Sequence, residues 1–239
     1  KYVDEFLPGV EIAHWVDETI QNTNFACAPG IIPPKNYLKF TQAALSLEDY
    51  GVDLILLACS TFNRAVEYAR PMVQTPLLQI DRPMMDLAVQ HGSRIGLLAT
   101  VPTTVPASER LLRIAAADAG KTIEIKTSLC SEAFAAIKAG QPDKHNDLLL
   151  AEIDRLSGQV DAIVLAQLSM SALEPRLTST KVPIYNSGRT AFTHIRQRFD
   201  GEWLFLYRLR LLHPMLSAGL LTVAFRPDWV DHLESKPNG

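Results

Sequence analysis

The chain has 239 residues, which is enough for one large α/β domain or two small lobes. Its apolar fraction of 47% and its charged fraction of 21% are ordinary for a globular protein. The 23 basic and 26 acidic residues give a net charge of −3, so the composition argues against a protein that binds nucleic acid.

Predicted strands and helices alternate along the chain. Three continuous apolar runs, DLILLA, RIGLLA and DAIVLA, are typical of strands that are covered on both faces. The predicted strands are residues 10–16, 53–58, 77–80, 94–99, 122–127, 161–166 and 183–185. The predicted helices are residues 35–50, 82–91, 106–119, 131–139, 145–156 and 188–199. This alternation indicates βαβ units and an α/β fold with a mostly parallel sheet.

Two segments of the chain repeat each other at an offset of 108 residues. Residues 52–58 read VDLILLA and residues 160–166 read VDAIVLA, so five of the seven positions are identical. A second short apolar stretch follows each of them, at residues 75–78 and 182–185. Unrelated apolar strands can resemble each other, but the matching order and spacing favour an internal duplication.

A duplicated α/β unit predicts two lobes that face each other. We expect a first lobe at residues 1–100, a second at residues 101–195 with the chain free to cross back, and a C-terminal tail at residues 196–239. Ligands bind beyond the carboxyl ends of parallel strands, so the loops after the two repeated strands should line one cleft. Cys59 and Gln167 hold equivalent positions in those loops.

Cys59 lies where the predicted strand 53–58 opens into a polar loop, CSTFN. Buried packing is a common role for cysteine, but the strand end and the hydroxyl and amide neighbours favour a catalytic acid/base. A helix that begins near Asn63 would direct its first N–H groups at this loop and favour the thiolate. We therefore expect the pKa of Cys59 to lie nearer neutrality than that of a free thiol.

Short polar side chains near these strand ends are predicted to bind a substrate carboxylate. Ser60, Thr61 and Asn63 offer neutral donors beside Cys59, although the same residue types also cap helices. Thr100 and Thr103 follow the predicted strand 94–99, where turn formation around two prolines is the alternative role.

The corresponding loop in the second half of the chain contains Gln167 and Ser169. A glutamine has no proton that titrates near neutral pH, so Gln167 can hold a carboxylate or carbonyl oxygen but cannot act as an acid or base. Ser169 lies two residues further on and is predicted to bind substrate beside it.

Neither a metal nor a cofactor is predicted. The chain has three cysteines, and Cys27 and Cys130, which have no polar loop in register, are assigned to packing. Without a C-x-x-C motif or a Cys/His cluster, neither a disulfide framework nor a zinc site is expected, and a reducing cytoplasm fits this usage best. The common motifs of nucleotide-binding proteins, metalloproteases and serine hydrolases are absent from the sequence.

Residues 203–225 are mostly apolar, but Arg208, Arg210, His213 and Pro214 interrupt them. Basic side chains and a proline make a membrane-spanning helix a poor interpretation of this stretch. We expect a buried or partner-facing segment that favours a homo-oligomer, and no membrane partner.

Four segments resemble the aspartate/glutamate/hydantoin racemase superfamily: DLILLACSTFN, LQIDRPM, RIGLLATVPT and DAIVLAQLSM. The resemblance runs from about residue 10 to about residue 193. It implies two pseudo-symmetric α/β lobes and cofactor-independent chemistry, in which one cysteine from each lobe serves one face of a substrate α-carbon. Cys59 matches the first of these cysteines, and Gln167 stands where the second is found.

The resemblance implies a racemase/epimerase-type isomerase that acts on a small carboxylic acid or amino-acid derivative, with Cys59 as its acid/base. A single thiol can also protonate one face of an enediolate, so a cofactor-free arylmalonate-type decarboxylase is the alternative. A small-acid binding protein without turnover is the third hypothesis. The family places a central strand ahead of its first helix. Residues 1–7 resemble that helix, so the strand has no counterpart in this sequence.

Overall fold

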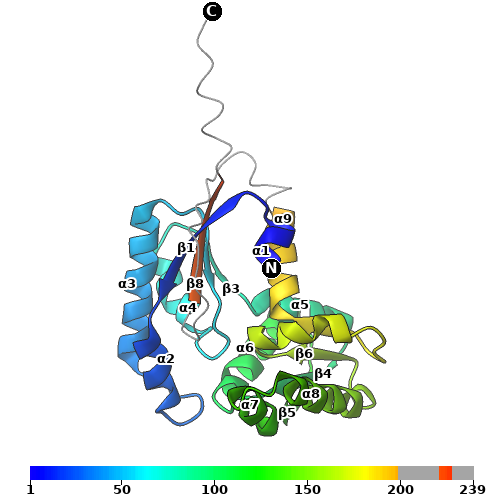
Figure 1. Ribbon diagram of the computed structural model, residues 1–239. Helices are drawn as coiled ribbons and strands as arrows, with labels where there is room; N and C mark the ends of the chain where they lie inside the picture. Colours follow the sequence, from blue (N-terminus) through cyan, green and yellow to red (C-terminus); the bar gives the residue numbers. More distant parts are fainter. Residues whose placement is uncertain (199–220, 228–239) are drawn as a thin grey trace, which may run out of the picture.

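The computed structural model describes residues 1–198 and 221–227, which form two four-stranded sheets flanked by helices (Figure 1). This arrangement confirms the predicted α/β fold class. Among the described residues, no helix has the length and hydropathy needed to cross a membrane. The apolar stretch at residues 203–225 lies mostly outside the described residues, so its predicted role stays a prediction.

The first sheet has the strand order β1-β8-β2-β3. Its strands are β1 (Val10–Val16), β2 (Ile55–Leu57), β3 (Leu77–Gln79) and β8 (Leu221–Pro227). The helices of this part are α2 (Glu18–Phe25), α3 (Pro34–Tyr50), α4 (Ala65–Ala69) and the short 3-10 helix η1 (Arg70–Met72). Alternate residues of β2 point to opposite faces, because Ile55 packs with Phe40 and Phe62 while Leu56 packs with Phe192.

The second sheet has the strand order β5-β4-β6-β7, and all its strands run parallel. Its strands are β4 (Arg94–Ala99), β5 (Glu124–Leu129), β6 (Ala162–Leu165) and β7 (Ile184–Asn186). The helices around it are α5 (Arg82–His91), α6 (Thr104–Asp118), α7 (Ser131–Lys138), α8 (Pro142–Ser157), the 3-10 helix η2 (Leu168–Arg176) and α9 (Ser187–Arg198). The central strands β4 and β6 are buried on both faces, which explains their continuous apolar sequences.

The predicted repeat reappears in the pairing of the strands. Ile55 of β2 pairs with Leu77 of β3, and Ile163 of β6 pairs with Ile184 of β7. The second pair lies 108 and 107 residues after the first, so both halves keep one register. Because each pair runs parallel, the loops after β2 and β6 leave at equivalent carboxyl ends.

Strand β8 is the element of the first sheet that the sequence patterns do not indicate. It lies between β1 and β2 and runs antiparallel to both, which makes this sheet mixed. Figure 1 shows β8 beside β1. The resemblance to the racemases implies that a strand ahead of the first helix lies at the centre of this sheet. Here a strand from residues 221–227 takes the central position and pairs with the edges of β1 and β2.

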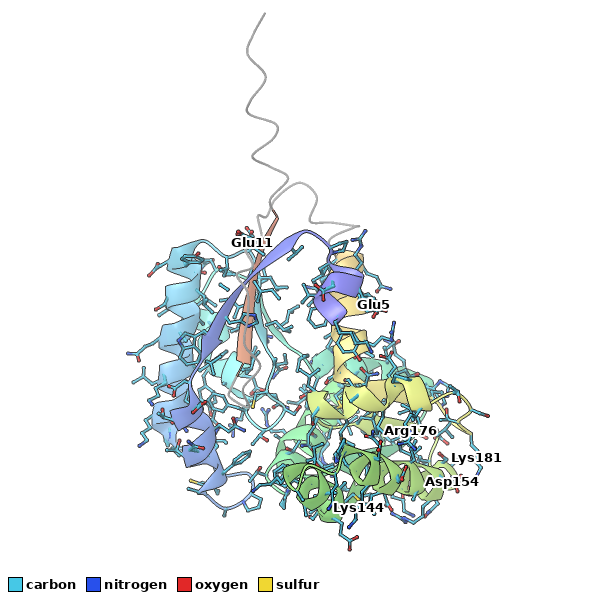
Figure 2. The ribbon with its side chains drawn as sticks, viewed as in Figure 1. Glu5, Glu11, Lys144, Asp154, Arg176 and Lys181 are labelled. Carbon is cyan, nitrogen blue, oxygen red and sulfur yellow. The ribbon has the colours of Figure 1, made fainter. Side chains whose placement is uncertain are left out.

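The chain returns to the first lobe through α9, which packs against α1 (Tyr2–Phe6) (Figure 1). The rings of Tyr2 and Phe192 stack with their centroids 6.0 Å apart. Arg189 of α9 also pairs with Glu5 of α1 at 3.0 Å. Figure 2 labels Glu5 on α1. Helix α9 falls mostly within the predicted second lobe but contributes to the core of the first sheet. The lobe boundaries at residues 100 and 195 stay a prediction.

Candidate functional site

A small pocket of about 190 Å³ lies between the two sheets. The loops after β2 and β6 both line it, so the structure brings Cys59 and Gln167 together as their equivalent positions indicate. The pocket is lined by Gln21, Asn24, Phe25, Ala58, Cys59, Ser60, Thr61, Val101, Thr104, Gln167, Leu168 and Ser169. Five of the eight predicted site residues therefore face one space.

The Cys59 side chain is half-buried at the pocket wall and packs against the core beside β2. Burial raises the pKa of its thiol to about 12, and the negative charge of Asp81 acts in the same direction. Backbone N–H groups of Phe62 and Thr61 donate to the sulfur and oppose this rise in pKa. The expectation of a lowered pKa is therefore wrong, because burial outweighs these donors and α4 begins only at Ala65.

Asp81 is a carboxylate of this region whose importance the sequence patterns do not indicate. It is fully buried at the start of α5, and Ser60 Oγ donates to its Oδ1 at 3.1 Å. Burial raises the pKa of Asp81 to about 7, although the Ser60, Ser187 and Asn63 side chains oppose the rise. In the sequence, an aspartate before Arg-Pro looks like an ordinary helix cap, so only its burial distinguishes it.

The remaining predicted residues of the first loop connect the two lobes. Thr61 Oγ1 and Thr104 Oγ1 lie 2.9 Å apart, which joins the loop after β2 to the start of α6. Asn63 is buried outside the pocket, where its Nδ2 donates to the backbone oxygen of Ala107 at 3.5 Å. Nearby, Arg110 of α6 makes a bidentate ion pair with Glu67 of α4 at 2.6 Å for each bond. These contacts hold the Cys59 loop against the second lobe.

Gln167 is oriented by Thr100, which is itself buried behind it. The backbone N–H and the hydroxyl of Thr100 both donate to Gln167 Oε1, at 2.7 and 2.9 Å. With its oxygen occupied in this way, the Gln167 amide can offer its N–H donors to a ligand in the pocket. Ser169 lines the pocket, whereas Thr103 does not and Thr104 takes that place.

Helix α2 supplies one wall of the pocket through Gln21, Asn24 and Phe25. Neither this helix nor these residues are indicated by the sequence patterns, because the segment is rich in Asn and Thr and has no apolar stripe. Gln21 Oε1 is buried without a hydrogen-bond partner among the described residues.

A larger pocket of about 740 Å³ lies along α5, α6 and α9. Arg82 in its wall is already paired with Asp86 and Asp118, each at 2.8 Å. None of the predicted site residues lines this pocket. The small pocket at Cys59 is therefore the better candidate for the active site.

Replacing Gln167 with alanine is expected to lower the free energy of unfolding by about 1–3 kcal/mol, because two buried donors of Thr100 lose their acceptor. Urea unfolding monitored by circular dichroism measures this loss. Thr100→Val is the matched variant, since it removes the hydroxyl donor but keeps the backbone N–H bond to Gln167. Thr100→Val should lower the free energy of unfolding by less than Gln167→Ala does. If Gln167→Ala were as stable as the parent, the orientation assigned to Gln167 would be wrong.

Comparisons with known proteins bear on the family of the chain and on its fold. The family model of the Asp/Glu/Hydantoin racemases matches residues 33–195, which is more than half of the chain. The glutamate racemase of Trichodesmium erythraeum (strain IMS101) is 28% identical over 133 residues, covering 54% of this chain and 48% of the relative. The chain thus spans about half the length of that curated relative.

Solved racemase structures share the fold. Glutamate racemase from Campylobacter jejuni subsp. jejuni aligns with a TM-score of 0.53 and 17% identity, covering 82% of this chain and 80% of that one. Allantoin racemase from Klebsiella pneumoniae aligns with a TM-score of 0.53 and 19% identity, covering 69% and 66%. At these identities the likeness concerns the fold alone. Because the family match over residues 33–195 covers more than half of the chain, the chain belongs to the Asp/Glu/Hydantoin racemase family.

Proposed function

We propose that this chain is a cofactor-independent racemase/epimerase-type isomerase that acts on a small carboxylic acid or amino-acid derivative through Cys59. The observation that carries the proposal is that Cys59 and Gln167, which follow equivalent strands of the two lobes, line the same pocket. Membership of the racemase family supports the same reaction class. The pocket volume of about 190 Å³ suits a small acid.

In the proposed reaction, the substrate carboxylate is held by neutral donors while the proton on the α-carbon is exchanged. The Gln167 amide, the Thr61 hydroxyl and Ser169 are the donors that the pocket offers. Hydrogen bonds to the carboxylate strengthen as charge moves onto its oxygens, so they stabilise the enediolate more than the bound substrate. This stabilisation supplies most of the rate in the proposed mechanism.

Cys59 carries the proton in this scheme. As a thiolate it takes the α-proton, so the C–H bond breaks, an S–H bond forms and the electron pair enters the enediolate. As a thiol it returns a proton to the α-carbon and becomes a thiolate again. On the opposite face the equivalent position is Gln167, which cannot transfer a proton, so water or Ser169 has to serve that face.

One observation favours the decarboxylase as the second candidate. The raised pKa keeps Cys59 protonated at neutral pH, which suits a proton donor better than a base. A malonate-like acid loses CO2 by breaking its own C–C bond and leaves an enediolate, which then needs only one proton on one face. The thiol of Cys59 can deliver that proton without first acting as a base.

Incubation of the chain in D2O with a panel of small chiral acids and malonate-like acids distinguishes these reactions. Deuterium at the α-position of recovered substrate, detected by NMR, is expected for an isomerase. Release of CO2 with deuterium on one face of the product identifies the decarboxylase instead. Binding of a panel acid without exchange or CO2 release would contradict both enzymatic proposals and leave a small-acid binding protein.

A further inference from the structure

Asp81 lies where the two lobes meet behind the pocket. It is the residue before α5, and its carboxylate faces Ser60 of the Cys59 loop and Ser187 at the first position of α9. Its Oδ2 is buried without a hydrogen-bond partner among the described residues, and so is the hydroxyl of Ser187. The carboxylate thus accepts one hydrogen bond, from Ser60, and the uncharged side chains of Ser187 and Asn63 lower its pKa from nearby.

A buried carboxylate without a cation is unusual, because its charge loses hydration without compensation. No cation pairs with Asp81 among the described residues. Arg82, its neighbour in sequence, is occupied by Asp86 and Asp118. Arg189 of α9 is occupied by Glu5 and Glu174. The titratable group that faces Asp81 from the loop after β2 is the thiol of Cys59.

Ser60 connects Asp81 to the pocket. It follows Cys59 in the chain, lines the pocket, and donates its hydroxyl proton to Asp81 Oδ1. The Cys59 thiol and the Asp81 carboxylate therefore lie on either side of one serine, close enough that the charge of Asp81 acts on the sulfur. Water cannot screen this interaction effectively, because Asp81 is fully buried.

We propose that Asp81 is a positioning residue that, through Ser60, holds the Cys59 loop against α9 and makes the proton affinity of the thiol depend on the charge of Asp81. The proposal rests on the proposed function only in treating Cys59 as the proton carrier. Protonated Asp81 leaves the thiol easier to ionise, and ionised Asp81 keeps the proton on sulfur. Two such neighbouring groups titrate as a coupled pair.

The pKa of Asp81 of about 7 puts this change in the neutral range. Above neutrality the ionised carboxylate raises the pKa of Cys59 further, so the thiol keeps its proton where a free thiol begins to lose it. Burial alone already keeps Cys59 mostly protonated over the physiological range, and ionised Asp81 lowers the thiolate fraction further.

Alkylation of Cys59 by iodoacetamide tests the coupling without any substrate. The Cys27→Ala, Cys130→Ala background leaves Cys59 as the only thiol of the chain. In this background Asp81→Asn is expected to accelerate alkylation at pH 8 by about tenfold, because the rate follows the thiolate fraction. Asp86→Asn is the matched control, since it makes the same change one turn along α5 in a surface ion pair, and its rate should stay at that of the background.

The background protein alone gives an independent readout that needs no substitution at Asp81. An uncoupled thiol with a pKa far above neutrality alkylates about a hundredfold faster at pH 8 than at pH 6. Ionisation of Asp81 within this range is expected to reduce the increase to about tenfold. A full hundredfold increase, or an Asp81→Asn rate equal to that of Asp86→Asn, would overturn the proposal.

The two proposals can fail separately. If Asp81→Asn accelerates the alkylation of Cys59 as expected, but no acid exchanges its α-proton for deuterium, the role of Asp81 stands and the isomerase proposal is wrong. If the α-proton of an acid exchanges in a reaction that needs Cys59, but Asp81→Asn leaves the alkylation rate of Cys59 unchanged, the isomerase proposal stands and the role of Asp81 is wrong.

Discussion

Cys59→Ala is expected to lower the rate of α-proton exchange by about a thousandfold or more, because it removes the proton carrier of the pocket. General acid/base groups contribute about 10²–10⁴ to rates, and a group that transfers the proton itself belongs to the upper part of that range. The remaining rate comes from the donors that stabilise the enediolate. Exchange of α-deuterium measured by NMR, on the acid that responds in the D2O screen, gives this ratio.

Cys130→Ala provides the matched control for this change. Cys130 is also half-buried, but it packs against the core of the second lobe and lies outside the pocket. The rate of α-proton exchange by Cys130→Ala should remain within a factor of about two of the rate of the parent protein. If Cys59→Ala exchanged the α-proton at the parent rate while folded, the assignment of Cys59 as acid/base would be wrong.

Asp81→Asn is expected to raise the free energy of unfolding at pH 8 by up to about 4 kcal/mol. The pKa of Asp81 rises by about three on folding, and each pKa unit corresponds to about 1.4 kcal/mol. The pKa of Asp81 rises from 3.8 in the unfolded chain to about 7 in the fold, so the folded state binds the extra proton between these values. The stability of the parent therefore falls as the pH rises through this window, and the loss is complete above pH 7. The variant has no carboxylate to ionise and avoids this loss.

The pH dependence is the part of this prediction that a simple packing effect would not produce. Like the protonated acid, the amide that Asp81→Asn introduces carries no charge. The gain in stability should therefore be large at pH 8 and small at pH 4. Urea unfolding at both values measures it, with Asp86→Asn as the control. A difference that does not vary with pH would contradict the buried, raised-pKa state of Asp81.

Strong local patterns allowed much of the fold to be predicted from sequence. The structure confirms β1, β4 and α5 with the predicted bounds, because β1 alternates, β4 is a continuous apolar run and α5 has Pro and Gly near its ends. The repeat also indicated correctly that Cys59 and Gln167 face one pocket. Their chemical roles stay predictions.

Features that depend on distant parts of the chain could not be predicted in this way. Strand β8 has no local partner, and the polar helix α2 has no apolar stripe to indicate it. The raised pKa of Cys59 depends on burial and on Asp81, and the burial of Asp81 depends on the approach of α9. Sequence shows which groups are present near the pocket, but their desolvation is set by the tertiary fold.

The central position of β8 also affects the order in which the protein can assemble during synthesis. Among the described residues β1 pairs with β8 alone, and Val10 and its partner Pro227 are more than 200 residues apart. At about 5–20 residues per second, a ribosome needs roughly 10–40 s to make that intervening chain. During this time β1 has an unpaired edge, so the second sheet, built from strands close in sequence, can form first. The lobe that begins the chain is then the last to close.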